Sequence, residues 1–169
     1  MVTAQVAEDW RDDIGFLAPA APWLLEAAGS AFVGLSAVAV AWRYDRSGGL
    51  EVALVKRRRR GDWGFPKGSP HAGEPLEDAA KRELFEEAGI ASRHWAPLAN
   101  LIYAARSGRT KLASYWLVRA GPGSFRPNRE ISKLSWLAPS DAREALTQER
   151  ERVVLDLAVE ALGLGLLAG

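Results

Sequence analysis

Residues Gly68–Ile90 read GSPHAGEPLEDAAKRELFEEAGI, and this stretch predicts one amphipathic helix framed by glycines. Pro75 is typical of the start of a helix, and Gly89 is typical of the residue just past its end. Together these two residues predict a helix over residues 76–88.

Three carboxylates of this predicted helix lie on one side. At ~100° per residue, Glu83, Glu86 and Glu87 fall within an arc of about 100°. The apolar stripe that borders this arc consists of Leu76, Ala80, Leu84 and Ala88. Carboxylates clustered at a partly buried edge repel one another and lose hydration unless a cation compensates, and Mg²⁺ or Mn²⁺ prefers such oxygen ligands. On the glutamates alone, a solvated face with ion-pair partners such as Lys81 or Arg82 is the alternative.

The complete stretch resembles the signature of the Nudix hydrolases. That signature is a glycine, five residues, a glutamate, seven residues, Arg-Glu, an aliphatic residue, any residue, Glu-Glu, any residue, a glycine and an aliphatic residue. It is filled here by Gly68, Glu74, Arg82, Glu83, Leu84, Glu86, Glu87, Gly89 and Ile90. The resemblance implies an α/β fold, namely an α/β/α sandwich around a mixed sheet. It also implies metal-dependent hydrolysis of a diphosphate bond in a nucleoside diphosphate linked to another group.

The resemblance implies roles for the charged residues of the stretch. Glu83, Glu86 and Glu87 are implied to be catalytic and to bind Mg²⁺ or Mn²⁺. Arg82 is implied to orient these glutamates through a charge-assisted hydrogen bond, and Glu74 is implied to support the site or to add a metal ligand.

Residues outside the predicted helix complete the implied site. Gly68 and Gly89 are the supporting glycines of the signature, and Lys67 is implied to offer its backbone carbonyl to the metal. Some family members use a further glutamate from a loop after the second half of the sheet. Glu130 fits that place as a catalytic and metal-binding residue, and the alternative is a solvated loop glutamate.

Basic and aromatic residues ahead of the helix point to a polyphosphate substrate. Residues 56–61 read KRRRRG, so Arg57 is a candidate phosphate ligand, with a solvated loop as the alternative. Residues 63–68, WGFPKG, resemble the entry to the signature in hydrolases of diadenosine polyphosphates and of diphosphoinositol polyphosphates. Lys67 is therefore a second candidate, and Trp63 is a candidate for stacking on a base, although packing is the alternative.

One residue after the helix favours the diadenosine polyphosphate group. Lys111 resembles its phosphate-contacting lysine, whereas Tyr103, the tyrosine nearest to the place of the group's tyrosine, lies a few residues short of it. We therefore expect hydrolysis of a dinucleoside polyphosphate such as diadenosine tetra- to hexaphosphate. The alternatives are a MutT-like hydrolysis of oxidised nucleoside triphosphates and hydrolysis of diphosphoinositol polyphosphates. A non-catalytic domain that senses a nucleotide is the alternative from another class.

The composition limits the remaining possibilities. The chain has 169 residues, of which 48% are hydrophobic and 25% charged, as in one ordinary globular domain. The net charge of +1 gives no case for a nucleic-acid partner, and the absence of cysteine excludes disulfides and thiolate chemistry. We find neither an apolar run of ~20 residues nor a signal-peptide pattern, so we expect no membrane partner and a cytoplasmic location.

The chain is expected to have two parts. Residues 1–30 are predicted to be an N-terminal extension that acts as an arm or lid, with a substrate cap or a homodimer contact as the sharper alternatives. Residues 31–169 are predicted to be the Nudix hydrolase domain. Within it, the patterns predict strands at 32–42, 50–56, 95–105, 112–119 and 131–137 and helices starting near 139 and spanning 147–162.

Overall fold

The computed structural model describes residues 14–17, 34–104 and 110–163. In chain order the elements are β1 (Ile14–Leu17), β2 (Gly34–Tyr44), β3 (Leu50–Arg57), β4 (Trp63–Gly64), β5 (Lys67–Gly68), α2 (Leu76–Ala88), β6 (His94–Ala104), β7 (Thr110–Arg119), β8 (Ile131–Leu137), α3 (Pro139–Ala145) and α4 (Glu149–Gly163). The predicted strands and helices are present, with ends shifted by a few residues.

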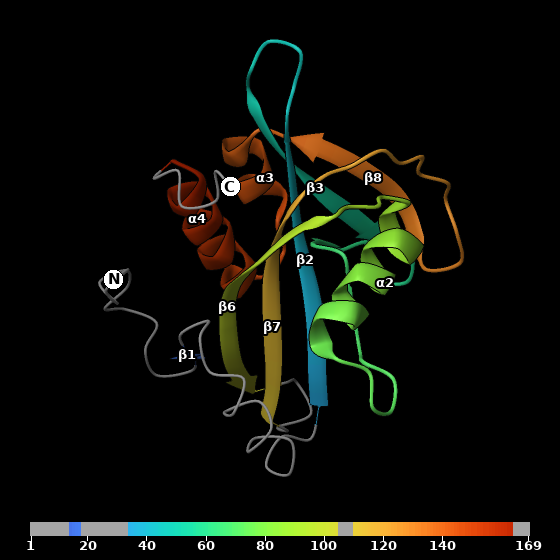
Figure 1. Ribbon diagram of the computed structural model, residues 1–169, viewed down its shortest axis with the longest axis vertical. Coiled ribbons are helices and arrows are strands. Elements are labelled where there is room, and N and C mark those ends of the chain that lie inside the picture. Colours follow the sequence, from blue (N-terminus) through green and yellow to red (C-terminus); the bar gives the residue numbers. More distant parts are fainter. Residues whose placement is uncertain (1–13, 18–33, 105–109, 164–169) are drawn as a thin grey trace.

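A mixed sheet of eight strands runs through the described part of the chain (Figure 1). The strands follow the order β1-β6-β7-β2-β3-β4, while β5 pairs with β2 and β8 pairs with β3. β2 and β7 are parallel, and the other pairs are antiparallel. The central strand β2 therefore has β7 along one edge, and along its other edge β5 pairs with its first half and β3 with its end.

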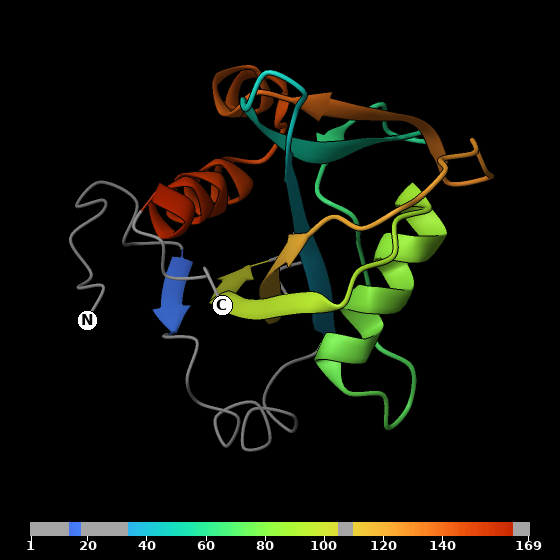
Figure 2. The same ribbon diagram turned by 45° about the horizontal axis from the view of Figure 1, so that its top comes forward.

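Helices cover both faces of the sheet (Figure 2). Neighbouring residues of a strand point to opposite faces, so β2 contributes to two cores. Ala37 and Ala39 pack on the α2 side, whereas Val38 and Val40 pack on the side of α3 and α4. The predicted α/β/α sandwich with a mixed sheet is confirmed.

Helix α2 has the bounds that its flanking residues predicted. Pro75 directly precedes its first turn, and Gly89 ends it with φ 66°, a left-handed conformation that favours glycine. A β-carbon at Gly89 would also collide with the Ser124 carbonyl. The end of the helix is thereby pinned against the loop that follows β7.

Part of the predicted N-terminal extension forms a strand that the sequence analysis did not predict. β1 pairs with β6 from Ile14↔Tyr103 to Leu17↔Asn100 and so widens the sheet at one edge. The rest of residues 1–30 and the predicted turn at 106–109 lie outside the described residues. The roles proposed for the extension, and its boundary at residue 30, stay predictions.

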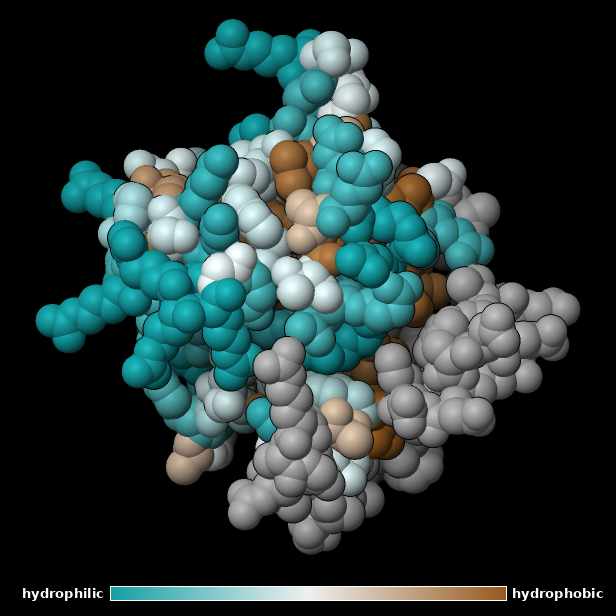
Figure 3. Space-filling view, turned by 180° about the vertical axis from the view of Figure 1, so that it is seen from behind, coloured by the Kyte–Doolittle hydropathy of each residue, from teal (hydrophilic) through white to brown (hydrophobic). Residues whose placement is uncertain are grey.

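The described surface seen from behind is mainly hydrophilic (Figure 3). Within the described ranges no helix has both the length and the apolar character needed to cross a membrane. The cytoplasmic location and the oligomeric state stay predictions.

Candidate active site

The three glutamates on one side of α2 differ in burial. The side chain of Glu87 is 6% exposed, that of Glu83 is 13% exposed and that of Glu86 is 56% exposed. Leu84 and Ala88, on the adjacent stripe, are fully buried. The acidic arc therefore borders the core and does not lie on the solvent side of the helix.

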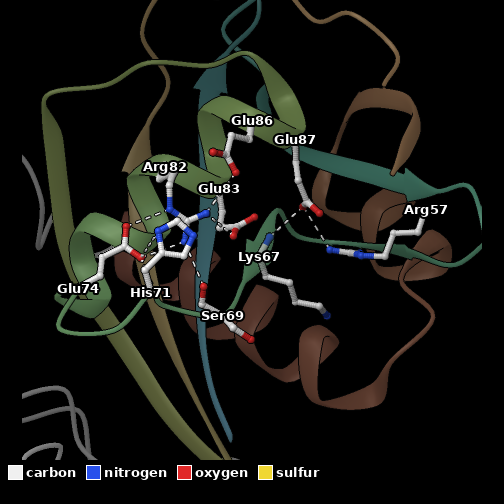
Figure 4. Close-up of polar contacts among 9 residues, drawn as sticks. All are labelled: Arg57, Lys67, Ser69, His71, Glu74, Arg82, Glu83, Glu86 and Glu87. Carbon is white, nitrogen blue, oxygen red and sulfur yellow. Dashed lines mark hydrogen bonds and ion pairs between the residues drawn. The ribbon is translucent and has the colours of Figure 1, made fainter. Parts of the chain in front are cut away.

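Arg82 connects this arc to the loop that precedes the helix (Figure 4). Its Nη1 donates to Glu83 at 2.6 Å and to Glu86 at 3.2 Å. Its Nε and Nη2 donate to the two oxygens of Glu74 at 2.9 and 3.0 Å, and Nη2 also donates to the Ser69 carbonyl at 3.0 Å. One planar guanidinium thus contacts three carboxylates, and the orienting role that the resemblance implies for Arg82 stays a prediction.

Glu74 accepts a further hydrogen bond from the His71 backbone N–H at 2.8 Å. The hydrogen bonds from Arg82, and then the one from His71, lower the pKa of Glu74 to about 2. The same pairing raises the pKa of Arg82 above its ordinary value. Glu74 is therefore ionised at neutral pH and pairs with Arg82.

Glu87 lies in a different environment at the end of the arc. Its Oε2 accepts the Lys67 backbone N–H at 2.9 Å and Nη2 of Arg57 at 3.3 Å. Burial disfavours the charged carboxylate and, although Arg57 and Lys67 oppose this effect, the pKa of Glu87 is raised to about 7. A carboxyl group with a pKa near neutrality is suited to accept and release protons.

Gly68 allows the sheet to approach the arc closely. β5 pairs with β2 through Gly68↔Ala37, which turns the Cα of Gly68 toward α2. A β-carbon there would overlap the Glu83 carboxylate. The first glycine of the signature is therefore required so that Glu83 can lie against the strand.

The glutamates do not form a closed metal cage. In the described part of the chain no three acidic or histidine side chains gather closely enough to enclose an ion. The donor set still suits Mg²⁺ or Mn²⁺, because it consists of carboxylate oxygens and these ions retain several water ligands.

Glu130 lies in a loop that is tied to α2. Nδ2 of Asn128 donates to the Glu86 carbonyl at 3.0 Å, and Oδ1 of Asn128 accepts the backbone N–H groups of Glu130 and Ile131 at 2.9 and 2.8 Å. Glu130 itself is exposed. The sequence analysis missed Asn128, although an asparagine in a loop ahead of a strand is a recognisable turn signal.

Lys67, Tyr103 and Lys111 share the face of the sheet that α4 covers. Lys67 and Tyr115 lie in one row across the sheet, because both pair with Val38 of β2. Tyr103 and Lys111 pair with each other in a second row, which crosses β7 four residues before Tyr115. Four residues of strand span about 13 Å. Arg150 of α4 lies 4.2 Å from the Tyr103 ring centre and close to the Tyr115 hydroxyl. Arg150 and Tyr115 were not predicted.

Two other substrate candidates lie elsewhere. The centre of the Trp63 ring lies 5.9 Å from Nζ of Lys56 and 5.8 Å from Nζ of Lys133, and the ring packs against the core beneath α3 and α4. Arg57 donates to Glu87 and to the Phe65 carbonyl at 3.1 Å. The structure therefore brings Arg57 to the acidic arc and leaves Trp63 in a packing position.

The NUDIX domain family model matches residues 35–157. The chain belongs to the Nudix family. The match includes β2 to β8, the acidic arc of α2 and most of α4.

Similar proteins carry names of more than one nucleotide-hydrolysing activity. A Mycolicibacterium smegmatis protein named 8-oxo-(d)GTP phosphatase is 38% identical over 106 residues, which are 63% of this chain and 33% of that protein. A Mycobacterium tuberculosis protein, provisionally named 8-oxo-dGTP diphosphatase 3, is 29% identical over 132 residues, which cover 72% of this chain and 61% of that protein. The Nudix chain thus spans about one third and about three fifths of these curated relatives.

A solved structure has the same architecture over nearly its full length. The crystal structure of a C. elegans Ap4A hydrolase binary complex matches with a TM-score of 0.69 and 26% identity. The match covers 78% of this chain and 98% of that chain.

Substitution of Gly68 by alanine should destabilise the Nudix domain by about 1–3 kcal/mol, because the new methyl group displaces the Glu83 carboxylate. Urea unfolding measures this change. Gly163→Ala is the matched control, since a β-carbon there meets nothing within 4 Å, and its effect should stay within about 0.5 kcal/mol. Equal stability of the two variants would contradict the close approach of Gly68 and Glu83.

The stability of the metal-free protein should depend on Glu87 in a defined pH window. The folded protein keeps this proton up to about pH 7, whereas the ordinary pKa is 4.5. Proton uptake by Glu87 therefore stabilises the fold below pH 4.5, and about 3 kcal/mol is lost as the pH rises to 7. Urea unfolding with a chelator present, in wild type and Glu87→Gln, isolates this contribution. Parallel curves for the two proteins would show that burial does not raise the pKa of Glu87.

Proposed function

We propose that this chain is a metal-dependent hydrolase of a phosphoanhydride bond in a nucleoside polyphosphate. The observation that carries the proposal is the set of three carboxylates, Glu83, Glu86 and Glu87, held at the edge of the core with Arg82 bonded to two of them. Such an arrangement concentrates negative charge on one side of α2. A divalent cation bound there would neutralise this charge and that of a substrate phosphate.

Mg²⁺ or Mn²⁺ would be held by Glu83, Glu86, Glu87, the Lys67 carbonyl and Glu130. When bound, it supplies positive charge that neutralises the phosphate oxygens and makes the attacking water more acidic. Arg82 keeps Glu83 and Glu86 in position during the reaction. Glu87 is the carboxylate best suited to take the water's proton, at the Oε1 atom that accepts neither Lys67 nor Arg57.

The preferred substrate is a dinucleoside polyphosphate such as diadenosine tetra- to hexaphosphate. Lys67 and the Tyr103–Lys111 pair occupy two rows about 13 Å apart on one face, and Arg150 contacts the far row. This spacing exceeds one phosphate group, so it favours a chain of several phosphates. The structural similarity to a protein named Ap4A hydrolase supports this choice.

A second candidate is hydrolysis of oxidised nucleoside triphosphates. The specific observation in its favour is the 38% identity to a protein named 8-oxo-(d)GTP phosphatase. Both reactions would use the same carboxylates. They differ in the substrate, which carries a second nucleoside in the first reaction and an oxidised base in the second.

A substrate panel with Mg²⁺ and with Mn²⁺ tests the proposal. We expect the highest kcat/KM for diadenosine tetra-, penta- or hexaphosphate, with lower values for oxidised and normal dNTPs, ADP-ribose and diphosphoinositol phosphates. Released products are separated and quantified by chromatography. A preference for 8-oxo-dGTP would favour the second candidate, and no turnover of any compound would favour a nucleotide-sensing domain.

The catalytic control for this panel is Glu86→Gln, which should lower activity roughly 10- to 100-fold or more. Glu77→Gln is its matched control, because Glu77 lies on the same helix, is 48% exposed and pairs only with Lys81. Similar rates for Glu86→Gln and Glu77→Gln would remove Glu86 from the site.

Lys111→Ala should raise KM for diadenosine pentaphosphate about tenfold with little change in kcat, because one charge-assisted contact to a distant phosphate is lost. Its side chain extends across Gly34, where the absence of a β-carbon leaves room for it. Steady-state kinetics measure the effect, with Lys81→Ala as the control lysine that pairs with Glu77 on α2. An unchanged KM for Lys111→Ala would exclude this residue from the phosphate-binding face.

A further inference from the structure

Glu151 of α4 is a carboxylate that is completely buried. Its exposed fraction is 0%, and in the described chain only Glu87 is a comparably buried acid. A buried carboxylate is costly unless cations and hydrogen bonds compensate for its lost hydration. The groups around Glu151 should therefore explain why a charge is retained there.

Lys67 is the cationic partner of Glu151. Its Nζ donates to Oε1 of Glu151, while its backbone N–H donates to Oε2 of Glu87 at 2.9 Å. Alternation along β5 sends the Lys67 side chain to the α4 face and leaves Gly68 against α2. One residue therefore contacts both buried carboxylates, with its backbone toward the reaction site and its ammonium toward α4.

Gly64 gives Glu151 the space that it needs. A β-carbon at Gly64 would lie 2.6 Å from Oε2 of Glu151 and 3.2 Å from Nη1 of Arg57. Both of these atoms are buried and have no hydrogen-bond partner in the described part of the chain. Arg57 also donates from Nη2 to Glu87. Lys67 and Arg57 thus lie between the carboxylate of α4 and the carboxylate of α2.

Positive charge exceeds negative charge around Glu151. Lys67 forms an ion pair with it, and Arg150 lies on the same face beside Tyr103 and Tyr115. One buried carboxylate therefore holds the lysine in place without cancelling all of the positive charge that an incoming phosphate would meet.

We propose that Glu151 is a positioning residue that holds the Lys67 ammonium in place on the α4 face, where substrate phosphates reach it. The identity of the ligand rests on the function proposed above. Without the Glu151 carboxylate, the ammonium has no ion-pair partner among the described residues and is no longer held in one place.

The test compares Glu151→Gln with Glu149→Gln. Glu149 lies two residues earlier on α4, is 60% exposed and pairs with Arg152, so it provides the same chemical change at the surface. Calorimetry without added metal measures binding of a methylene-bridged diadenosine tetraphosphate, and kinetics give kcat and KM. We expect Glu151→Gln to weaken binding and raise KM about tenfold with kcat changed less than twofold, and Glu149→Gln to change neither. Unchanged binding by Glu151→Gln would overturn the proposal.

The Lys67→Met background shows whether Glu151 acts through the lysine. In that background, adding Glu151→Gln should change binding less than twofold, because the group that Glu151 positions is gone. An equal loss in both backgrounds would instead indicate a structural role and overturn the proposal. Thermal unfolding of each variant verifies the fold. If Glu151→Gln does not fold, Glu151→Asp retains the charge on a shorter side chain and should give an intermediate rise in KM.

A second ligand distinguishes an error in the positioning role of Glu151 from an error in the assignment of the substrate. Binding is also measured with an imido-linked 8-oxo-dGTP. If wild type binds only this analogue, the dinucleotide assignment fails and the Glu151 comparison is made with the triphosphate. If Lys67→Met weakens neither analogue while wild type still hydrolyses the substrates, the positioning role is overturned and the hydrolase function stands.

Discussion

The guanidinium of Arg82 controls the geometry of the acidic side of α2. Without a cation, the carboxylates of Glu74, Glu83 and Glu86 would repel one another and rotate toward solvent. Arg82 donates two hydrogen bonds to Glu74 and, from its third nitrogen, donates to Glu83 and Glu86. Glu74 is kept ionised by the same contact, since its pKa is lowered to about 2. These ion pairs, at the edge of the core, therefore connect the loop before α2 to the helix itself.

β5 connects this network to the opposite layer, although it has only two residues. Its glycine turns toward α2 and allows Glu83 to lie against the strand, while its lysine turns toward α4 and meets Glu151. The backbone N–H of the same lysine donates to Glu87. Because successive strand residues face opposite ways, a single dipeptide joins α2 to α4, which covers the other face of the sheet.

Local signals made α2 and its carboxylates predictable, whereas long-range pairing concealed Glu151. Pro75 and Gly89 mark the helix ends within the chain itself, and the spacing of Glu83, Glu86 and Glu87 determines their shared side. Glu151 stands among charged residues at the start of α4 and has the sequence pattern of a solvated turn. Its burial follows from Lys67, which lies 84 residues earlier. The pairing of β1 with β6 depends on contacts of the same long-range kind.

The acidic side of α2 and the basic and aromatic residues near α4 lie on opposite faces of the sheet. Glu83, Glu86 and Glu87 come from α2, whereas Lys67 and the Tyr103–Lys111 pair lie in two rows on the face that α4 covers, with Arg150 beside Tyr103. Changes on that face can alter the ligand without disturbing Arg82 and its glutamates. We therefore propose that the α4 face, where Glu151 pairs with Lys67, selects the substrate.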